Sequence, residues 1–185
     1  MYSPCKIAQM GAFFAQKQGG IISAPKLMQL LYLADRESLL RYGRPITYDR
    51  PVAMPHGPVL ARTLDLMAGF TGGVPAAQWD EWMIAGANHD VAVKRKFCRT
   101  DLDEISNADL DVLESIRHTF GGMDPQALRN WTREYCTEWT DPDGSVTPID
   151  DVTWLRSVGT PDDQVQELAD EMRDERAVDG LFGRP

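Results

Sequence analysis

Apolar residues recur at three- and four-residue steps near the start of the chain. Over residues 4–17 this spacing predicts a helix that ends at Gly19-Gly20. A second helix follows Ser23, carries an apolar stripe over Leu27–Ala34 and ends at Gly43. Because further apolar residues widen that stripe, we expect the second helix to lie at the centre of the core.

The next segment, Arg44–Pro58, is predicted to be non-helical, because its prolines remove backbone donors and restrict the residues that precede them. Within it, Val52–Met54 should be extended, and helical spacing returns over Val59–Met67. We therefore predict a rigid structural corner between an extended piece and a helix, with the last proline in the first turn of that helix. The corner consists of Pro55, His56, Gly57 and Pro58.

The period changes to two on either side of Gly86–Asp90, and this predicts a β-hairpin within residues 79–98. Helical spacing resumes after Ser106, after Asp124 and after Thr160. The predicted fold class is mainly α (α+β): a compact helical domain with one small antiparallel β-hairpin or sheet and a C-terminal acidic helix.

Charge divides the chain into two parts. The 185 residues carry 19 basic and 28 acidic side chains, a net charge of −9. Residues 160–185 hold eight acids and three basic residues, 3 − 8 = −5 of that total. We therefore predict a helical domain over residues 1–158 and a separate acidic helix and tail over 159–185. A protein with this charge is disfavoured as a nucleic-acid ligand, because its field repels phosphate.

Several classes of protein are disfavoured by what the chain lacks. No apolar run reaches the length needed to cross a bilayer, and the first residues do not resemble a signal peptide. The three cysteines, Cys5, Cys98 and Cys136, are widely spaced, odd in number and without a CxxC pair, which favours reduced thiols. These features predict a cytoplasmic protein with no membrane partner.

His56 has three possible roles: a catalytic base, a metal ligand or part of a structural corner. A general base needs a group that orients it and a nucleophile or water beside it, and the sequence around His56 supplies neither. The other histidines, His89 and His118, do not have metal-ligand spacing. The structural role is favoured, with His56 at a helix N-terminus bonding a buried carbonyl or carboxylate.

Other candidate chemistry is weak. Asp35-Arg36-Glu37 lies on the most apolar helix, so we weigh a buried or interface ion pair against a solvated face. Asp141-x-Asp143-Gly144 resembles part of a calcium loop, but Val152 stands where the bidentate acid is required. No phosphate-binding glycine loop is present. We therefore predict no catalytic residue, no cofactor and no metal, and a protein that acts by binding.

Two segments carry a resemblance to a known family. Lys26-Leu27-Met28-Gln29-Leu30-Leu31-Tyr32-Leu33-Ala34-Asp35-Arg36 and Val52-Ala53-Met54-Pro55-His56-Gly57-Pro58-Val59 resemble the signature of the Panacea domain, the SocA-like antitoxin family. Thr137-Glu138-Trp139-Thr140-Asp141, Pro148-Ile149 and the helix after the corner, Val59–Thr63, resemble further parts of it. The resemblance covers about residues 4–155.

The resemblance implies a helical antitoxin that neutralises a cognate toxin protein by direct contact. In SocA it also implies a proteolytic adaptor that presents the toxin to ClpX of the ClpXP protease. The family's toxins are diverse, so the resemblance names no particular toxin, and a homo-oligomer remains open. The acidic segment after about residue 160 lies beyond the motifs and is expected to be the partner-specific part, steering a basic toxin surface.

Eight residues are candidates for partner contacts: Asp35, Arg36, Arg62, Trp139, Glu167, Asp170, Glu171 and Asp174. Two other functions compete with the antitoxin. One is a small hydrolase-like enzyme that uses His56, and it requires a cleft where His56 meets an acid and a nucleophile. The other is a DNA-binding regulator of its own operon, and the net charge of −9 weakens it.

Overall fold

The structure is a computed structural model that describes residues 1–182. Over these residues the fold is mainly helical, with two three-stranded antiparallel sheets. The helices are α1 (Pro4–Lys17), α2 (Ala24–Tyr42), α3 (Ala61–Met67), α4 (Gly73–Trp82), a 3-10 turn (Arg99–Asp101), α5 (Asn107–Phe120), α6 (Pro125–Tyr135), α7 (Asp151–Ser157) and α8 (Asp162–Phe182). The strands are β1 (Ile21–Ser23), β2 (Pro51–Met54), β3 (Gly57–Leu60), β4 (Met83–Ala85), β5 (Asp90–Val93) and β6 (Thr147–Pro148).

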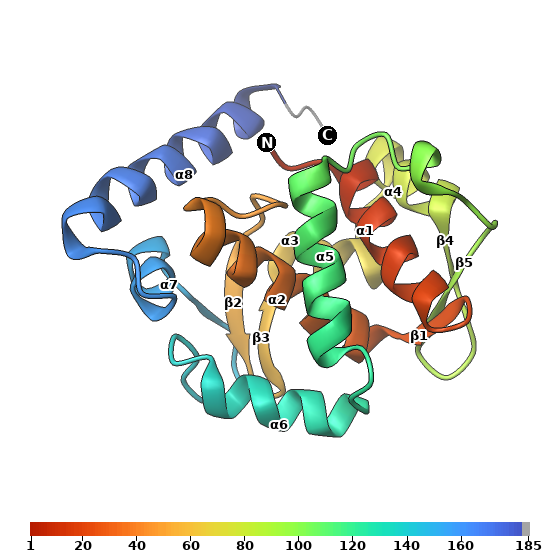
Figure 1. Ribbon diagram of the computed structural model, residues 1–185, viewed down its shortest axis with the longest axis horizontal. Coiled ribbons are helices and arrows are strands. Elements are labelled where there is room, and N and C mark those ends of the chain that lie inside the picture. The colour runs from red at the N-terminus through yellow and green to blue at the C-terminus, as the bar shows by residue number, and fades with distance from the viewer. Residues whose placement is uncertain (183–185) are drawn as a thin grey trace.

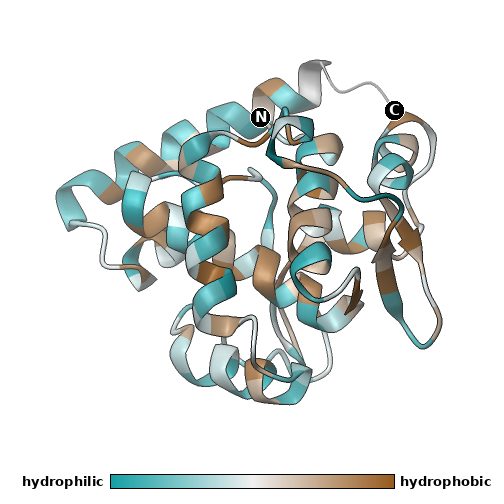
Figure 2. Cartoon of the chain, turned by 45° about the vertical axis from the view of Figure 1, so that its right-hand side comes forward, coloured by the Kyte–Doolittle hydropathy of each residue, from teal (hydrophilic) through white to brown (hydrophobic). Residues whose placement is uncertain are grey.

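The second helix forms the centre of the core, as its apolar stripe predicted. Helix α2 packs against α1, α5, α6 and β3, and Leu27, Leu30 and Leu31 are fully buried. Gly43 ends the helix in the left-handed conformation, with φ of 68°. Figure 1 shows α2 enclosed by its neighbours, and Figure 2 shows the hydrophobic colouring concentrated on the inner helices. The predicted class, mainly α with a small antiparallel β part, is confirmed.

The predicted β-hairpin is present but shorter than expected. Strands β4 and β5 pair antiparallel, and β1 pairs with the other side of β5, so the order is β1-β5-β4. Trp79 and Trp82, expected in a strand, belong to α4 and are buried, and this helix packs against α1. The three-residue step between the tryptophans places both on one face of a helix, whereas in a strand they would point to opposite faces.

The second sheet has the order β3-β2-β6 and lies against α2 and α6. It arises because Ala53 pairs with Thr147, which brings a segment from beyond α6 back to the hairpin β2–β3. The sequence predicted one sheet. The second was missed because residues 58–60 of β3 were expected to begin a helix, and because β6 has only two residues and shows no period. Strand β3 is followed directly by helix α3.

The C-terminal helix runs along one side of the molecule and ends near the N-terminus (Figure 1). The backbone N–H of Tyr2 donates to Asp179 at 2.7 Å, which ties the two ends together. Residues 183–185 of the predicted acidic tail lie outside the described residues. Within the described part of the chain, no helix is long and apolar enough to span a membrane.

Candidate partner-binding surfaces

The corner residues form the turn of the hairpin β2–β3. Met54 pairs with Gly57, so two residues complete the turn between the strands. Gly57 has φ of 111°, and a Cβ atom at this position would come within 2.9 Å of Thr132 Oγ1 on α6. Glycine is therefore required here both for its backbone angle and for the close approach of α6.

The expected position of Pro58 was wrong. Pro58 lies in strand β3, paired with Ala53, and the helix begins only at Ala61. The physical reason is cross-strand packing: Val59 pairs with Val52, and both side chains are buried. The corner thus joins two strands, and the turn into α3 follows after β3.

His56 lies exposed in this turn rather than at a helix N-terminus. Its backbone carbonyl accepts a hydrogen bond from Gln29 Nε2 at 3.2 Å, and its Nδ1 atom lies 3.0 Å from Nη1 of Arg129. A general base in a hydrolase needs an acid to orient it and a nucleophile beside it, whereas the ring of His56 faces a cation. This arrangement gives the hydrolase hypothesis no support.

Asp35 is fully buried on α2 and holds the loop that follows the helix. Its carboxylate accepts hydrogen bonds from the backbone N–H groups of Ile46 and Thr47, both at 2.9 Å, and from the hydroxyl of Thr47. Burial raises the pKa of Asp35 to about 7, although the hydrogen bonds from Thr47 act in the opposite direction. The structure assigns this residue a role inside the fold, where it has no surface to offer a partner.

A second buried carboxylate, Asp49, holds the start of α3. It accepts hydrogen bonds from the backbone N–H groups of Arg62 at 3.0 Å and Thr63 at 2.7 Å, and from the Thr63 hydroxyl at 2.7 Å. Asp49 therefore caps the N-terminus of α3, although it lies at least twelve residues upstream in the sequence. A carboxylate at a helix N-terminus stabilises the N–H groups that have no partner within the helix. Sequence reasoning missed it, because a capping residue this far away has no local signature.

The ion pair that we weighed for the second helix is present and largely buried. Arg36 Nε lies 3.0 Å from Oε1 of Glu138, whose side chain is 0% exposed, and Arg36 Nη2 donates to the carbonyl of Ser157 at 3.1 Å. The hydroxyl of Tyr32 also donates to Glu138, and burial, together with the charge of Glu138, raises the pKa of Tyr32. Glu138 was quoted within the C-terminal motif but not selected as a site residue.

The candidate residues Arg62 and Trp139 can be reached by solvent: Arg62 is exposed and Trp139 is partly buried. The guanidinium of Arg62 is exposed and lies 3.5 Å from the ring centroid of Tyr2. Trp139 is half-buried, and its Nε1 donates to the carbonyl of Met54 at 2.9 Å, while Arg133 lies over the ring at 4.7 Å. Trp139 therefore connects the C-terminal motif to the residue before the corner.

The structure thus brings the motif residues together around α2. We use the name motif centre for the buried polar contacts of the motif residues Tyr32, Asp35, Arg36 and Glu138, together with those of Asp49, which lies between the quoted motifs. Cys136 lies beside it, and burial raises the pKa of its thiol to about 12, so this cysteine is held protonated. All three cysteines are free. Among the described residues, no group of three His, Cys, Asp or Glu side chains is placed to hold a metal ion.

The other four candidate residues lie apart from the motif centre, on α8. We call them the acidic face: Glu167, Asp170, Glu171 and Asp174. Three of them are exposed, and Asp170 is partly buried, 2.6 Å from Arg173 on the same helix. Figure 2 shows this helix mostly in the hydrophilic colour. Their charges therefore point mainly into solvent.

The opposite side of α8 is packed onto the fold. Val165, Ala169 and Met172 are buried, and Arg176 binds the carboxylate of Asp151 on α7 with its closest contact at 2.6 Å. Arg176 also donates to the backbone carbonyl of Asp49 at 3.1 Å. These contacts fix the direction in which the acidic face points.

These features define a mainly helical protein whose buried charged residues hold the fold and whose last helix carries a row of exposed acids. The family model described as "Antitoxin SocA-like, Panacea domain" matches residues 27–140, more than half of the chain. The protein belongs to this family. No curated protein and no solved structure matches. The matched region contains most of α2, the hairpin β2–β3 and Glu138, and it ends before α7 and α8.

Proposed function

We propose that the protein is an antitoxin that binds a cognate toxin protein directly and neutralises it. Membership of the SocA-like antitoxin family is the observation that carries this proposal. Family membership also favours a binding role over a catalytic one, and a protein is the expected partner. The cytoplasm is the expected place of action.

The distribution of charge supports a basic toxin surface as the target. The chain has a net charge of −9, and the acidic face is held outward by contacts on the other side of α8. A negative surface of this kind raises the rate at which a positively charged partner is encountered. Toxins that act on nucleic acids or on nucleic-acid machinery commonly carry such positive surfaces.

A further part of the proposal is the fate of the bound toxin. We propose that the protein acts as a proteolytic adaptor that delivers the toxin to ClpXP. Direct blocking and delivery make different demands: blocking requires only a stable complex, whereas delivery requires the toxin to disappear while the antitoxin remains. The two are separated by following toxin levels rather than growth.

The test is co-expression with the product of the gene adjacent to this one. We expect that product to arrest growth alone, co-expression to restore growth, and the two purified proteins to elute together in size-exclusion chromatography. Absence of both rescue and complex would overturn the antitoxin proposal. Toxin half-life after translation arrest, measured with and without ClpX, tests the adaptor role: an unchanged half-life leaves direct blocking.

A further inference from the structure

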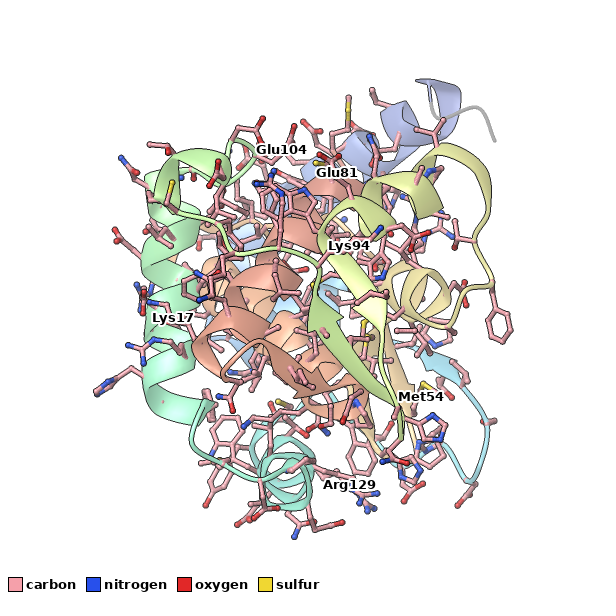
Figure 3. All side chains as sticks on the ribbon, turned by 90° about the vertical axis from the view of Figure 1, so that its right-hand side faces the viewer. Lys17, Met54, Glu81, Lys94, Glu104 and Arg129 are labelled. Atoms are coloured by element: carbon pink, nitrogen blue, oxygen red, sulfur yellow. The ribbon has the colours of Figure 1, made fainter. Side chains whose placement is uncertain are left out.

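An open groove of about 510 Å³ lies between the corner and the second hairpin. Its walls come from the start of α2, the turn of β2–β3, α3 and the tip of β4–β5. Figure 3 looks onto the hairpin β4–β5, with Met54 beside its lower end and Arg129 below. We call this the methionine groove, and its lining includes Met28, Met54, Val59, Leu64, Met67 and Ala85.

The floor of the groove is a hydrophobic cluster distinct from the main core. Met28 and Val59 are buried there, and Met54, Leu64 and Met67 pack against them while remaining partly accessible. Three of the chain's eight methionines thus lie in one small surface cluster. Methionine side chains are unbranched and polarisable, so they adapt to apolar side chains of different shapes. The floor therefore suits a large apolar side chain from another molecule.

A buried hydrogen-bond acceptor at the groove is left without a partner. Gln29 lines the groove and is only 4% exposed, and its Nε2 atom donates to the carbonyl of His56 at 3.2 Å. Its Oε1 atom is buried and has no hydrogen-bond partner among residues 1–182. Leaving such an atom unsatisfied costs about 1–3 kcal/mol, so a bound segment whose donor reaches Oε1 through a shift of the Gln29 side chain gains from binding it.

The far wall adds a negative charge and an open strand edge. Asp90 lines the groove and forms no ion pair within the described part of the chain. Strand β4 lies at the end of the order β1-β5-β4, and its residues Ile84 and Ala85 are exposed. An open edge of this kind pairs readily with an extended chain.

We propose that the methionine groove is the docking site for an extended, apolar segment of the toxin that carries a lysine or arginine. The apolar side chain enters the methionine floor, a donor binds Gln29 Oε1, and the cation lies near Asp90. This inference rests on the proposed function and names the surface that it uses. A second copy of the chain is disfavoured as the occupant, because two molecules of charge −9 repel each other.

The groove can be blocked at Ala68, an exposed residue that lines it just after α3. Ala68→Trp fills the groove without disturbing a buried side chain. The matched control is Ala77→Trp, which changes an exposed alanine on α4 that does not line the groove. By titration calorimetry with the toxin, we expect Ala68→Trp to weaken binding by about tenfold or more and Ala77→Trp to leave it unchanged. Equal melting temperatures would show that both variants fold.

A second measurement locates the toxin directly. Methionine methyl groups are labelled with ¹³C, and toxin is added to the wild-type antitoxin. We expect the signals of Met28, Met54 and Met67 to shift and those of core residues such as Met10 and Met172 to stay in place. Shifts of the same three signals on raising the antitoxin concentration alone would identify a second copy as the occupant and overturn the proposal.

The outcomes separate this inference from the antitoxin function. If the wild-type chain neutralises the toxin and Ala68→Trp neutralises it equally well, with no shift at the three groove methionines, the groove proposal is wrong and the function stands. If the wild-type chain neither binds nor neutralises the toxin, the function itself has failed.

Discussion

Acidic residues have different roles in the motif centre and on the acidic face. In the motif centre, Asp35, Asp49 and Glu138 are buried, and each accepts at least two hydrogen bonds from the fold. On α8, acids such as Glu167 and Glu171 extend into solvent. The family model covers the first region and ends before the second. The comparison indicates that the buried acids within the family-matched region maintain the scaffold, while α8 adds a set of exposed acids outside that region.

The difference between the two regions is tested most clearly by removing one acid from each and measuring the free energy of unfolding. Glu138→Ala leaves Arg36, whose side chain is 19% exposed, without its carboxylate partner and the buried Tyr32 hydroxyl without its acceptor. Losing one member of a buried ion pair costs about 3–5 kcal/mol. Glu167→Ala removes an exposed acid on α8 and should change the free energy of unfolding by less than about 0.5 kcal/mol. Denaturant titrations of both variants measure the difference, and a loss below about 0.5 kcal/mol for Glu138→Ala would show that Glu138 does not support the fold.

The apolar side of α2 offers a similar contrast within one helix. Leu31 is fully buried, so Leu31→Ala should destabilise the protein by about 2–5 kcal/mol. Leu40 lies on the same helix with 58% of its surface exposed, and Leu40→Ala should cost less than about 0.5 kcal/mol. Chemical denaturation tests both. A loss below about 1 kcal/mol for Leu31→Ala would mean that this side of α2 is not core.

The pH dependence of stability should reveal the buried acid Asp35. Its pKa is about 7 in the folded protein, against about 3.9 in an unfolded chain, so the folded state holds the proton more tightly. The free energy of unfolding should therefore fall as pH rises from about 4 to about 7, by at most about 1.4 kcal/mol per pH unit. Below and above this window the contribution is constant.

The variant Asp35→Asn isolates this contribution, since an amide keeps an acceptor for Ile46 and Thr47 but does not titrate. The difference in stability between wild type and Asp35→Asn should depend on pH only within the window. Asp150, whose pKa is lowered first by its hydrogen bond from the Thr153 hydroxyl, contributes in the opposite direction at lower pH and is common to both proteins. Parallel pH profiles would show that the pKa of Asp35 does not change on folding.

The parts of the fold that were predicted are those with local signals. The bounds of α1 match the predicted range, Ser106 and Asp124 cap α5 and α6 as expected, and Gly43 ends α2. The parts that were missed depend on distant contacts. Strands β1 and β6 are too short to show a period, and α7 has only two turns.

The candidate site was predicted less completely than the fold. The motifs indicated where important residues lie, but not that Asp35 would face the loop after α2 or that Arg36 would meet Glu138. Both contacts join segments far apart in the sequence, and spacing along the chain carries no information about them. The methionine groove was missed for the same reason, since its walls come from four separate elements.

The smallest effect on the fold is expected from neutralising the acidic face. Changing Glu167, Asp170, Glu171 and Asp174 to their amides leaves the buried residues Val165, Ala169 and Met172 in place, so the melting temperature should hardly change. Deleting the whole helix is a poorer test, because it would also remove this packing and the Arg176–Asp151 contact.

Neutralising the acidic face should instead change the rate at which the protein associates with the toxin. We expect the exposed charges on α8 to attract a basic toxin surface over distances comparable with the Debye length, about 8 Å at physiological salt. We expect the amide variant to associate about tenfold more slowly at low salt, to dissociate at an almost unchanged rate and to lose most of its salt dependence. Neutralising the exposed acids Asp80, Glu81, Asp111 and Glu134 changes the net charge equally and serves as the control. If both sets slow association equally in stopped-flow measurements, only net charge matters; if neither does, α8 is a structural helix and its acids do not steer the toxin.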